Sequence, residues 1–72
     1  MKDLRKIASN QIVLENEKLL TLSVVEIYNG VVQRYYPLTQ EMPNTEWLVG
    51  QVCLKREDDG TLRAYYKNKV IE

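Results

Sequence analysis

The stretch VVEIYNGVVQRYYPL, residues 24–38, indicates the fold class of this chain. Two runs rich in β-branched residues flank Asn29-Gly30, and both of these residues tolerate the positive φ angles of a two-residue type I′ turn. The stretch therefore predicts a β-hairpin. Closing the turn there gives four expected cross-strand pairs: Tyr28–Val31, Ile27–Val32, Val25–Arg34 and Val24–Tyr35.

The rest of the chain continues this pattern of β-branched and aromatic runs separated by turn signals. The turn signals fall at residues 15–18, 29–30, 37–45 and 57–60, and no window has the apolar spacing of an amphipathic helix. We expect strands at residues 6–14, 19–28, 31–36, 47–56 and 61–67, with residues 68–72 extending the fifth strand or returning against another one. The one place for a short helix is residues 1–7. These features predict an all-β fold, a single small antiparallel barrel or sandwich of five to six strands in a meander.

The longest expected strand changes the side on which its apolar residues lie. Apolar residues alternate in one phase up to Val24 and in the opposite phase at Val25 and Ile27. A strand with one buried face cannot change phase without an extra residue, because a slip of one residue turns every side chain over. We therefore expect either a β-bulge near Ser23 or a long strand that serves two packed layers.

A second hairpin is expected around EDDG, residues 57–60. The tripeptide Asp58-Asp59-Gly60 matches a three-residue loop that ends in a left-handed glycine. A two-residue loop would leave the flanking strands without a coherent apolar face. The three-residue loop predicts three cross-strand pairs: Leu54–Ala64, Val52–Tyr66 and Lys55–Arg63.

At 72 residues the chain has room for one domain, residues 1–72, with residues 1–5 as its candidate flexible end. A chain this short often completes its core with a disulfide, a metal or a second copy of itself. It has one cysteine, Cys53, and no histidine, so neither an intramolecular disulfide nor a structural zinc site is expected. A homodimer is the remaining route, unless the core alone suffices. No catalytic, cofactor-binding or metal-binding residue is predicted, since the usual general base and most transition-metal sites need histidine.

The charges cancel, with 10 basic and 10 acidic residues. A neutral chain argues against nucleic acid and anionic membranes as partners, because both attract proteins through an excess of basic side chains. No apolar run approaches the roughly 20 residues that span a bilayer. The free cysteine and the lack of a signal-type apolar stretch near the N-terminus predict a reducing, cytoplasmic location.

The segment KIASNQIVLENEKLLTLSVVEIYNGVVQRYYPL, residues 6–38, resembles the small β-domain that opens many amidohydrolase-superfamily enzymes. In those enzymes the chain then enters a barrel whose first strand carries metal-binding histidines. Here it continues into TQEMPNTEWLVGQV, which has no histidine, so no catalytic or metal-binding residue carries over. The resemblance implies a free-standing relative of a non-catalytic β-domain, acting beside a separately encoded hydrolase.

Aromatic and basic residues supply the candidate interaction surface. Four of the tyrosines form two adjacent pairs, Tyr35-Tyr36 and Tyr65-Tyr66. Adjacent strand residues point to opposite faces, so each pair places one ring inward and one outward. Packing within the core is one interpretation of these rings, and a protein interface is another, because Tyr, Trp and Arg dominate binding hot spots. The loop at residues 37–45, which Glu41 and Glu46 flank together with Met42 and Trp47, is the most plausible place for a specific contact, and a plain connection is the other interpretation. The candidate residues are Arg34, Tyr35, Tyr36, Met42, Trp47, Arg63 and Tyr65.

These observations favour a non-enzymatic cytoplasmic module for protein–protein interaction that associates with itself. A different class of function also fits the aromatic residues: a small OB-type or Sm-like barrel that stacks single-stranded nucleic acid on its outward tyrosines. The resemblance adds the accessory β-domain of a hydrolase as the remaining alternative.

Overall fold

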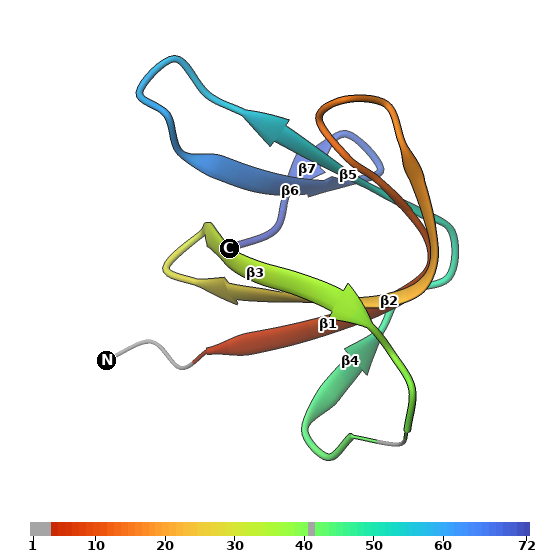
Figure 1. Cartoon of the computed structure of the whole chain (residues 1–72). Helices are drawn as coiled ribbons and strands as arrows, with labels where there is room; N and C mark the ends of the chain where they lie inside the picture. Colours follow the sequence, from red (N-terminus) through yellow and green to blue (C-terminus); the bar gives the residue numbers. More distant parts are fainter. Residues whose placement is uncertain (1–3, 41) are drawn as a thin grey trace.

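A computed structural model describes residues 4–40 and 42–72, and every regular element in this part of the chain is a strand (Figure 1). The all-β class expected from the sequence is confirmed, in a small domain with one seven-stranded sheet. The helix expected at residues 1–7 is wrong where the structure describes it, since Arg5–Ile7 is strand, and the rest of that segment and most of the expected flexible end lie outside the described residues. The strands are β1 (Arg5–Val13), β2 (Leu19–Tyr28), β3 (Val31–Pro37), β4 (Thr45–Trp47), β5 (Gln51–Arg56), β6 (Leu62–Tyr66) and β7 (Lys69–Val70).

The β2–β3 hairpin turns at Asn29 and Gly30, whose φ angles are 53° and 78°. Both are positive, as a type I′ turn requires. The pairs Tyr28–Val31 and Ile27–Val32 are confirmed, but the register then shifts between Glu26 and Ile27. Gln33 is the extra residue on β3, so the other two expected pairs are wrong by one position. Val25 pairs with Tyr35 and Val24 with Tyr36.

The change of apolar phase occurs where β1 and β2 bend together. Ile7 and Ile12 both enter the core although they are an odd number of residues apart, and the β1–β2 register is the same before and after the bend. The expected bulge near Ser23 is therefore absent from this ladder, and the register shift of β2 lies three residues later. Leu22 has a φ of 22°, and this unusual backbone angle allows the apolar residues of β2 to change faces without an inserted residue. The other alternative, a long strand serving two layers, describes the fold, and Figure 1 shows β1 and β2 curving from one layer to the other.

Two buried serines face each other at this bend. Ser9 pairs with Ser23, and both side chains are excluded from solvent. The Ser23 hydroxyl donates a hydrogen bond to the Thr21 carbonyl at 2.7 Å, and the Ser9 hydroxyl donates one to the Gly50 carbonyl at 2.5 Å. Small polar residues suit this position because bent strands leave backbone carbonyls that need a donor.

The sheet is mixed, which corrects the expected antiparallel meander. Its order is β3-β2-β1-β5-β6-β7, and both β4 and β5 run parallel to β1. The single strand expected at residues 47–56 is thus two strands, separated by Leu48, Val49 and Gly50. Gly50 has a φ of 112°, a conformation that a residue with a side chain rarely adopts. The break therefore depends on glycine.

The β5–β6 hairpin has the predicted loop and the predicted pairs. Gly60 is left-handed, with a φ of 88°, and its N–H bonds to the Glu57 carbonyl at 2.9 Å. Residues Lys67 and Asn68, both with positive φ, then return the chain as β7 against β6. The sheet does not close into a barrel, although Arg63 on β6 donates a hydrogen bond at 2.9 Å to the carbonyl of Gly30 in the β2–β3 turn.

The core lies between the two layers and is wholly aliphatic. The core cluster comprises Ile7, Ile12, Val25, Ile27, Val32, Val52, Leu54, Ala64 and Ile71.

The described part of the chain contains no helix that is long and apolar enough to cross a membrane.

Candidate interaction surface

The layer β3-β2-β1-β4 has an outer face, on the side away from the core, and we call this surface the crossover face. Because strand residues alternate between faces, the cross-strand pairs place its residues in two rows. One row is Arg34, Glu26, Lys6 and Thr45; the other is Tyr36, Val24, Ala8 and Trp47.

Residues 38–40 and 42–44 belong to the connection from β3 to β4, which crosses this face. β3 and β4 both run parallel to β1, on opposite sides of β2 and β1, so the connection has to cross one side of the sheet, and the core fills the other. The crossing starts where the Leu38 N–H donates a hydrogen bond to the Leu22 carbonyl at 3.0 Å. Val24 and Ala8 are fully buried although they lie outside the main core, which is consistent with a segment lying over them.

A hollow of about 570 Å³ lies between this crossing segment and β4. That volume is within the range of sites for small ligands and for inserted side chains. Trp47 forms part of its wall and is 60% exposed, which is unusual for so large an apolar side chain. The lining residues are Leu38, Met42, Asn44, Thr45, Glu46 and Trp47.

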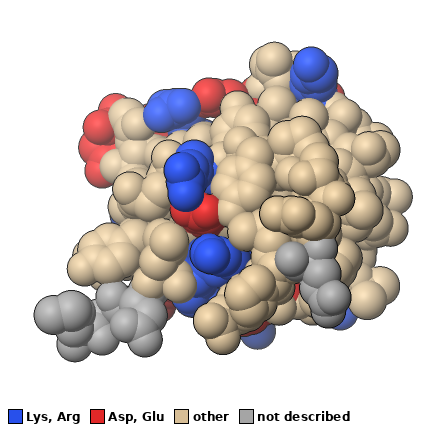
Figure 2. Space-filling view, turned by 60° about the horizontal axis from the view of Figure 1, so that its bottom comes forward, with Lys and Arg blue, Asp and Glu red and all other residues tan. Residues whose placement is uncertain are grey.

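Charged groups are unevenly distributed on this side of the molecule. Figure 2, in which the bottom of Figure 1 comes forward, shows charged side chains gathered toward one side and a broad uncharged surface on the other. On the crossover face, the row that holds Glu26 also holds Arg34 and Lys6, and Glu26 is the charge in this row that is buried.

Glu26 is only 3% exposed and is held as an anion by its neighbours. Arg34 Nε donates a hydrogen bond to Oε1 at 2.9 Å, and the Tyr36 hydroxyl donates one to Oε2. The hydrogen bonds from Arg34 and Tyr36 lower the pKa of Glu26, while burial and the bond to Glu26 raise the pKa of Tyr36. A carboxylate held in this way is a structural anion rather than a general acid, because it is ionised at neutral pH and its oxygens are occupied.

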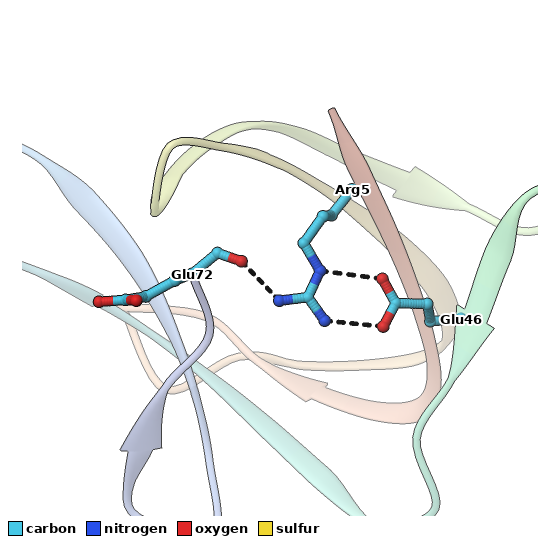
Figure 3. Close-up of polar contacts among 3 residues, drawn as sticks. All are labelled: Arg5, Glu46 and Glu72. Carbon is cyan, nitrogen blue, oxygen red and sulfur yellow. Dashed lines mark hydrogen bonds and ion pairs between the residues drawn. The ribbon is translucent and has the colours of Figure 1, made fainter. Parts of the chain in front are cut away.

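Glu46, which the sequence placed beside the longest loop, is bound to Arg5 (Figure 3). Arg5 Nε and Nη2 donate to the two carboxylate oxygens at 2.9 and 2.7 Å, and Nη1 donates to the Glu72 backbone carbonyl at 2.5 Å. The two bonds from Arg5 to the carboxylate lower the pKa of Glu46, and the three bonds together join β1, β4 and Glu72. Glu41, its expected companion, lies outside the described residues.

Each of the four arginines has a glutamate within salt-bridge distance, and Arg56, like Arg5, donates two hydrogen bonds to its partner. The remaining pairs are Arg34–Glu26 at 2.9 Å, Arg56–Glu15 at 2.8 Å and Arg63–Glu57 at 3.8 Å. The fixed charges of the arginines are thus compensated within the chain, which leaves the lysines as its flexible cations.

The structure distributes the seven candidate residues over different parts of the surface. Arg34, Tyr36, Met42 and Trp47 belong to the crossover face or its hollow. Tyr35 lies on the opposite side of β3, and Arg63 and Tyr65 lie on β6 in the other layer. Leu38, Asn44 and Thr45 were not singled out from the sequence, although the loop that contains them was.

Nothing in the described part of the chain resembles a metal centre. Residues 4–40 and 42–72 contain no cluster of three or more Cys, Asp or Glu side chains that could hold an ion. Cys53 is a free, half-buried thiol in β5, as the sequence suggested.

The chain matches no protein family, no curated protein and no solved structure. The resemblance of residues 6–38 to the β-domain of amidohydrolase-superfamily enzymes therefore stays a prediction. The functional interpretation rests on the geometry of the crossover face.

Proposed function

We propose that the chain is a non-enzymatic protein-interaction module that associates with a second copy of itself through the crossover face. The observation that carries this proposal is Trp47, 60% exposed on the wall of a hollow that Leu38 and Met42 also line. Trp and Met are enriched at protein interfaces, and a large aromatic side chain beside an apolar hollow is typical of a binding hot spot.

A second copy suits this face because of its charge balance. The formal net charge is zero and every arginine already has a glutamate partner, so two copies do not repel and no strong field selects an oppositely charged protein. In a two-fold dimer the same patch meets itself, so Trp47 of each copy can enter the hollow of the other. The burial gained would also supplement the small core of a 72-residue chain.

We also place the module in the reducing cytoplasm. Its one cysteine, Cys53, is a free thiol inside a strand, and proteins with unpaired cysteines are commoner in reducing compartments.

The association is tested by analytical ultracentrifugation and light scattering from low to high micromolar concentration. We expect a monomer–dimer equilibrium that Trp47→Ala weakens by about 30-fold or more, since truncation of a hot-spot residue costs at least roughly 2 kcal/mol. Leu19→Ala is the matched control, because Leu19 is also an exposed large apolar residue but lies at the start of β2, in the other layer. A strict monomer at high micromolar concentration, or equal association of both variants and the wild type, would rule the proposal out.

A further inference from the structure

We propose that the chain also binds a small phosphate-bearing aromatic compound, in a second hollow on the other layer. This hollow of about 300 Å³ lies between β5, β6 and the turn that follows β6. It does not include any residue of the crossover face, so this proposal stands apart from self-association. Lys55, Lys67, Tyr65 and Tyr66 define its chemistry.

The two lysines supply uncompensated positive charge. The Lys55 ammonium lies 5.2 Å from the centre of the Tyr65 ring, and the Lys67 ammonium lies 5.4 Å from the centre of the Tyr66 ring. Neither forms a salt bridge with a described carboxylate, in contrast to the four arginines. A contact with an aromatic ring leaves an ammonium's N–H donors free, so both lysines can still bind an anion.

The nearby acid is already occupied. The Glu57 carboxylate accepts a hydrogen bond from the Tyr65 hydroxyl at 2.8 Å and faces Arg63 at 3.8 Å. Two free cations therefore line one hollow, and a phosphate monoester, which carries close to two negative charges at neutral pH, matches them. A carboxylate would neutralise only one of the two.

The walls of the hollow are fixed before a ligand arrives. The Tyr66 hydroxyl donates a hydrogen bond to the Val49 carbonyl, and its ring lies against Gly50, where an added Cβ would be 3.7 Å from Cε1. The Tyr65 hydroxyl is held by Glu57, and the tight turn at Lys67 and Asn68 has two positive φ angles. Rigid rings reduce the ordering cost of binding, and two aromatic side chains in the lining favour a ligand with an aromatic part.

Neutral hydrogen-bonding groups complete the lining. The side-chain amides of Gln51 and Asn68 border the hollow together with the lysines. Each amide offers both donors and an acceptor, which suits the oxygens of a phosphate and the ring nitrogens of a heterocycle. The site thus combines charge for the phosphate with neutral groups for the ring.

The test titrates the full chain with adenosine 5′-monophosphate at low salt and follows backbone amide shifts by NMR. We expect saturable shifts confined to residues 49–55 and 65–68, weaker binding of inorganic phosphate at the same amides, and weaker binding of adenosine. Lys55→Gln and Lys67→Gln should each weaken binding of the nucleotide by about tenfold, the size of one charge-assisted hydrogen bond. Lys18→Gln is the matched control, since Lys18 is exposed in the β1–β2 turn.

Trp47→Ala separates this proposal from self-association, because it should leave nucleotide binding unchanged even where it abolishes the dimer. The proposal is overturned by the absence of saturable shifts at these amides, by equal loss in Lys18→Gln, or by unchanged binding in both lysine variants. Binding of inorganic phosphate as tight as that of the nucleotide would also overturn it, because the aromatic part would then contribute nothing.

Discussion

Tyr36 lies diagonally across from Glu26 on the adjacent strand, and the tyrosine hydroxyl donates a hydrogen bond to a carboxylate that is almost completely buried. The contact depends on the extra residue Gln33, which brings Tyr36 rather than Tyr35 onto the crossover face. The same shift sets Arg34 opposite Glu26, so one bulge satisfies both oxygens of the buried acid. The contacts of Glu26 with Arg34 and Tyr36 therefore depend on the register of β2 and β3. Their contribution to stability can be tested by varying the pH.

Stability should fall in acid in a way that depends on Glu26. The pKa of Glu26 is lower in the folded chain than its usual value of 4.5, first because of the bond from Arg34 and then because of the bond from Tyr36. The unfolded chain therefore binds the proton more readily, and the stabilisation that is complete above about pH 4.5 is lost as the pH falls through the folded pKa. Urea denaturation between pH 3 and pH 7 should show a shallower acid slope for Glu26→Gln. Parallel pH profiles for both proteins would contradict this.

The Tyr36 hydroxyl should contribute measurably to stability. Tyr36→Phe keeps the ring but removes the donor, so one oxygen of a buried carboxylate is left unpaired at a cost of about 1–3 kcal/mol. At alkaline pH the wild-type protein should lose the stabilisation that the Tyr36 hydroxyl contributes. The pKa of Tyr36 is raised above 10.0, so its contribution is complete below that pH and is lost as the pH rises through the folded pKa. Tyr36→Phe should lack this part of the alkaline loss, and a wild-type stability at neutral pH would show the bond to be dispensable.

Gly50→Ala should destabilise the domain through the backbone alone. A Cβ at this position makes only an ordinary contact of 3.7 Å with Tyr66, but a φ of 112° is strained for alanine. We expect a loss of about 1–3 kcal/mol in the free energy of unfolding. Gln51→Ala, at the exposed neighbouring position, is the control and should change stability by less than about 0.5 kcal/mol. Equal midpoints in urea would show that the break between β4 and β5 does not need glycine.

The Arg5–Glu46 pair should contribute modestly to stability. Its side chains are 39% and 48% exposed, so water screens the pair despite its two parallel bonds. A double-mutant cycle with Arg5→Gln and Glu46→Gln should give a coupling of about 0.5–1 kcal/mol that shrinks in 1 M salt. Arg5→Gln also removes the bond to the Glu72 carbonyl, so exchange of the Ile71 amide, which bonds to Ala64, should speed up more than in Glu46→Gln. Equal exchange rates would mean that Arg5 does not hold the C-terminal residue.

Core truncation should separate buried from exposed apolar residues. Ile12 is fully buried where β1 enters the second layer, so Ile12→Ala should cost about 2–5 kcal/mol, a large part of the stability of so small a domain. Val49 is 86% exposed, and Val49→Ala should change stability by less than about 0.5 kcal/mol. Thermal unfolding followed by circular dichroism distinguishes the two. A small effect of Ile12→Ala would show that the core is less tightly packed than its burial indicates.

Local sequence signals predicted the hairpins well. Asn29-Gly30 and Asp58-Asp59-Gly60 fix their turns through backbone preferences of a few residues, and the pairs next to each turn followed. The bulge at Gln33 escaped prediction because nothing in VVQRYY distinguishes an inserted residue from a paired one. It is stabilised by Glu26, Arg34 and Tyr36 only after the strands have paired.

The parallel pairing of β1 with β4 and β5 could not be inferred from the sequence. A run such as TEWLVGQVCLKR has the same composition in either direction of pairing, and its break at Gly50 serves a distant hydroxyl, that of Ser9. The crossover face depends on this pairing, which explains why the sequence could not show that Trp47 and Met42 line one hollow while Tyr35, Arg63 and Tyr65 lie elsewhere. The sequence shows which side chains could bind a partner, but only the strand topology shows which of them lie next to one another.

The parallel ladders also set an order of assembly for a growing chain. The partners of β1 in β4 and β5 lie about 40 positions later in the sequence, whereas β2 and β3 follow it directly. During synthesis β1 can therefore pair on one side early, while its other edge keeps unsatisfied backbone groups until residue 53 has left the ribosome. For that interval the nascent chain presents an open strand edge, the element most prone to pairing with a neighbouring chain, and β4 and β5 remove that hazard when they arrive.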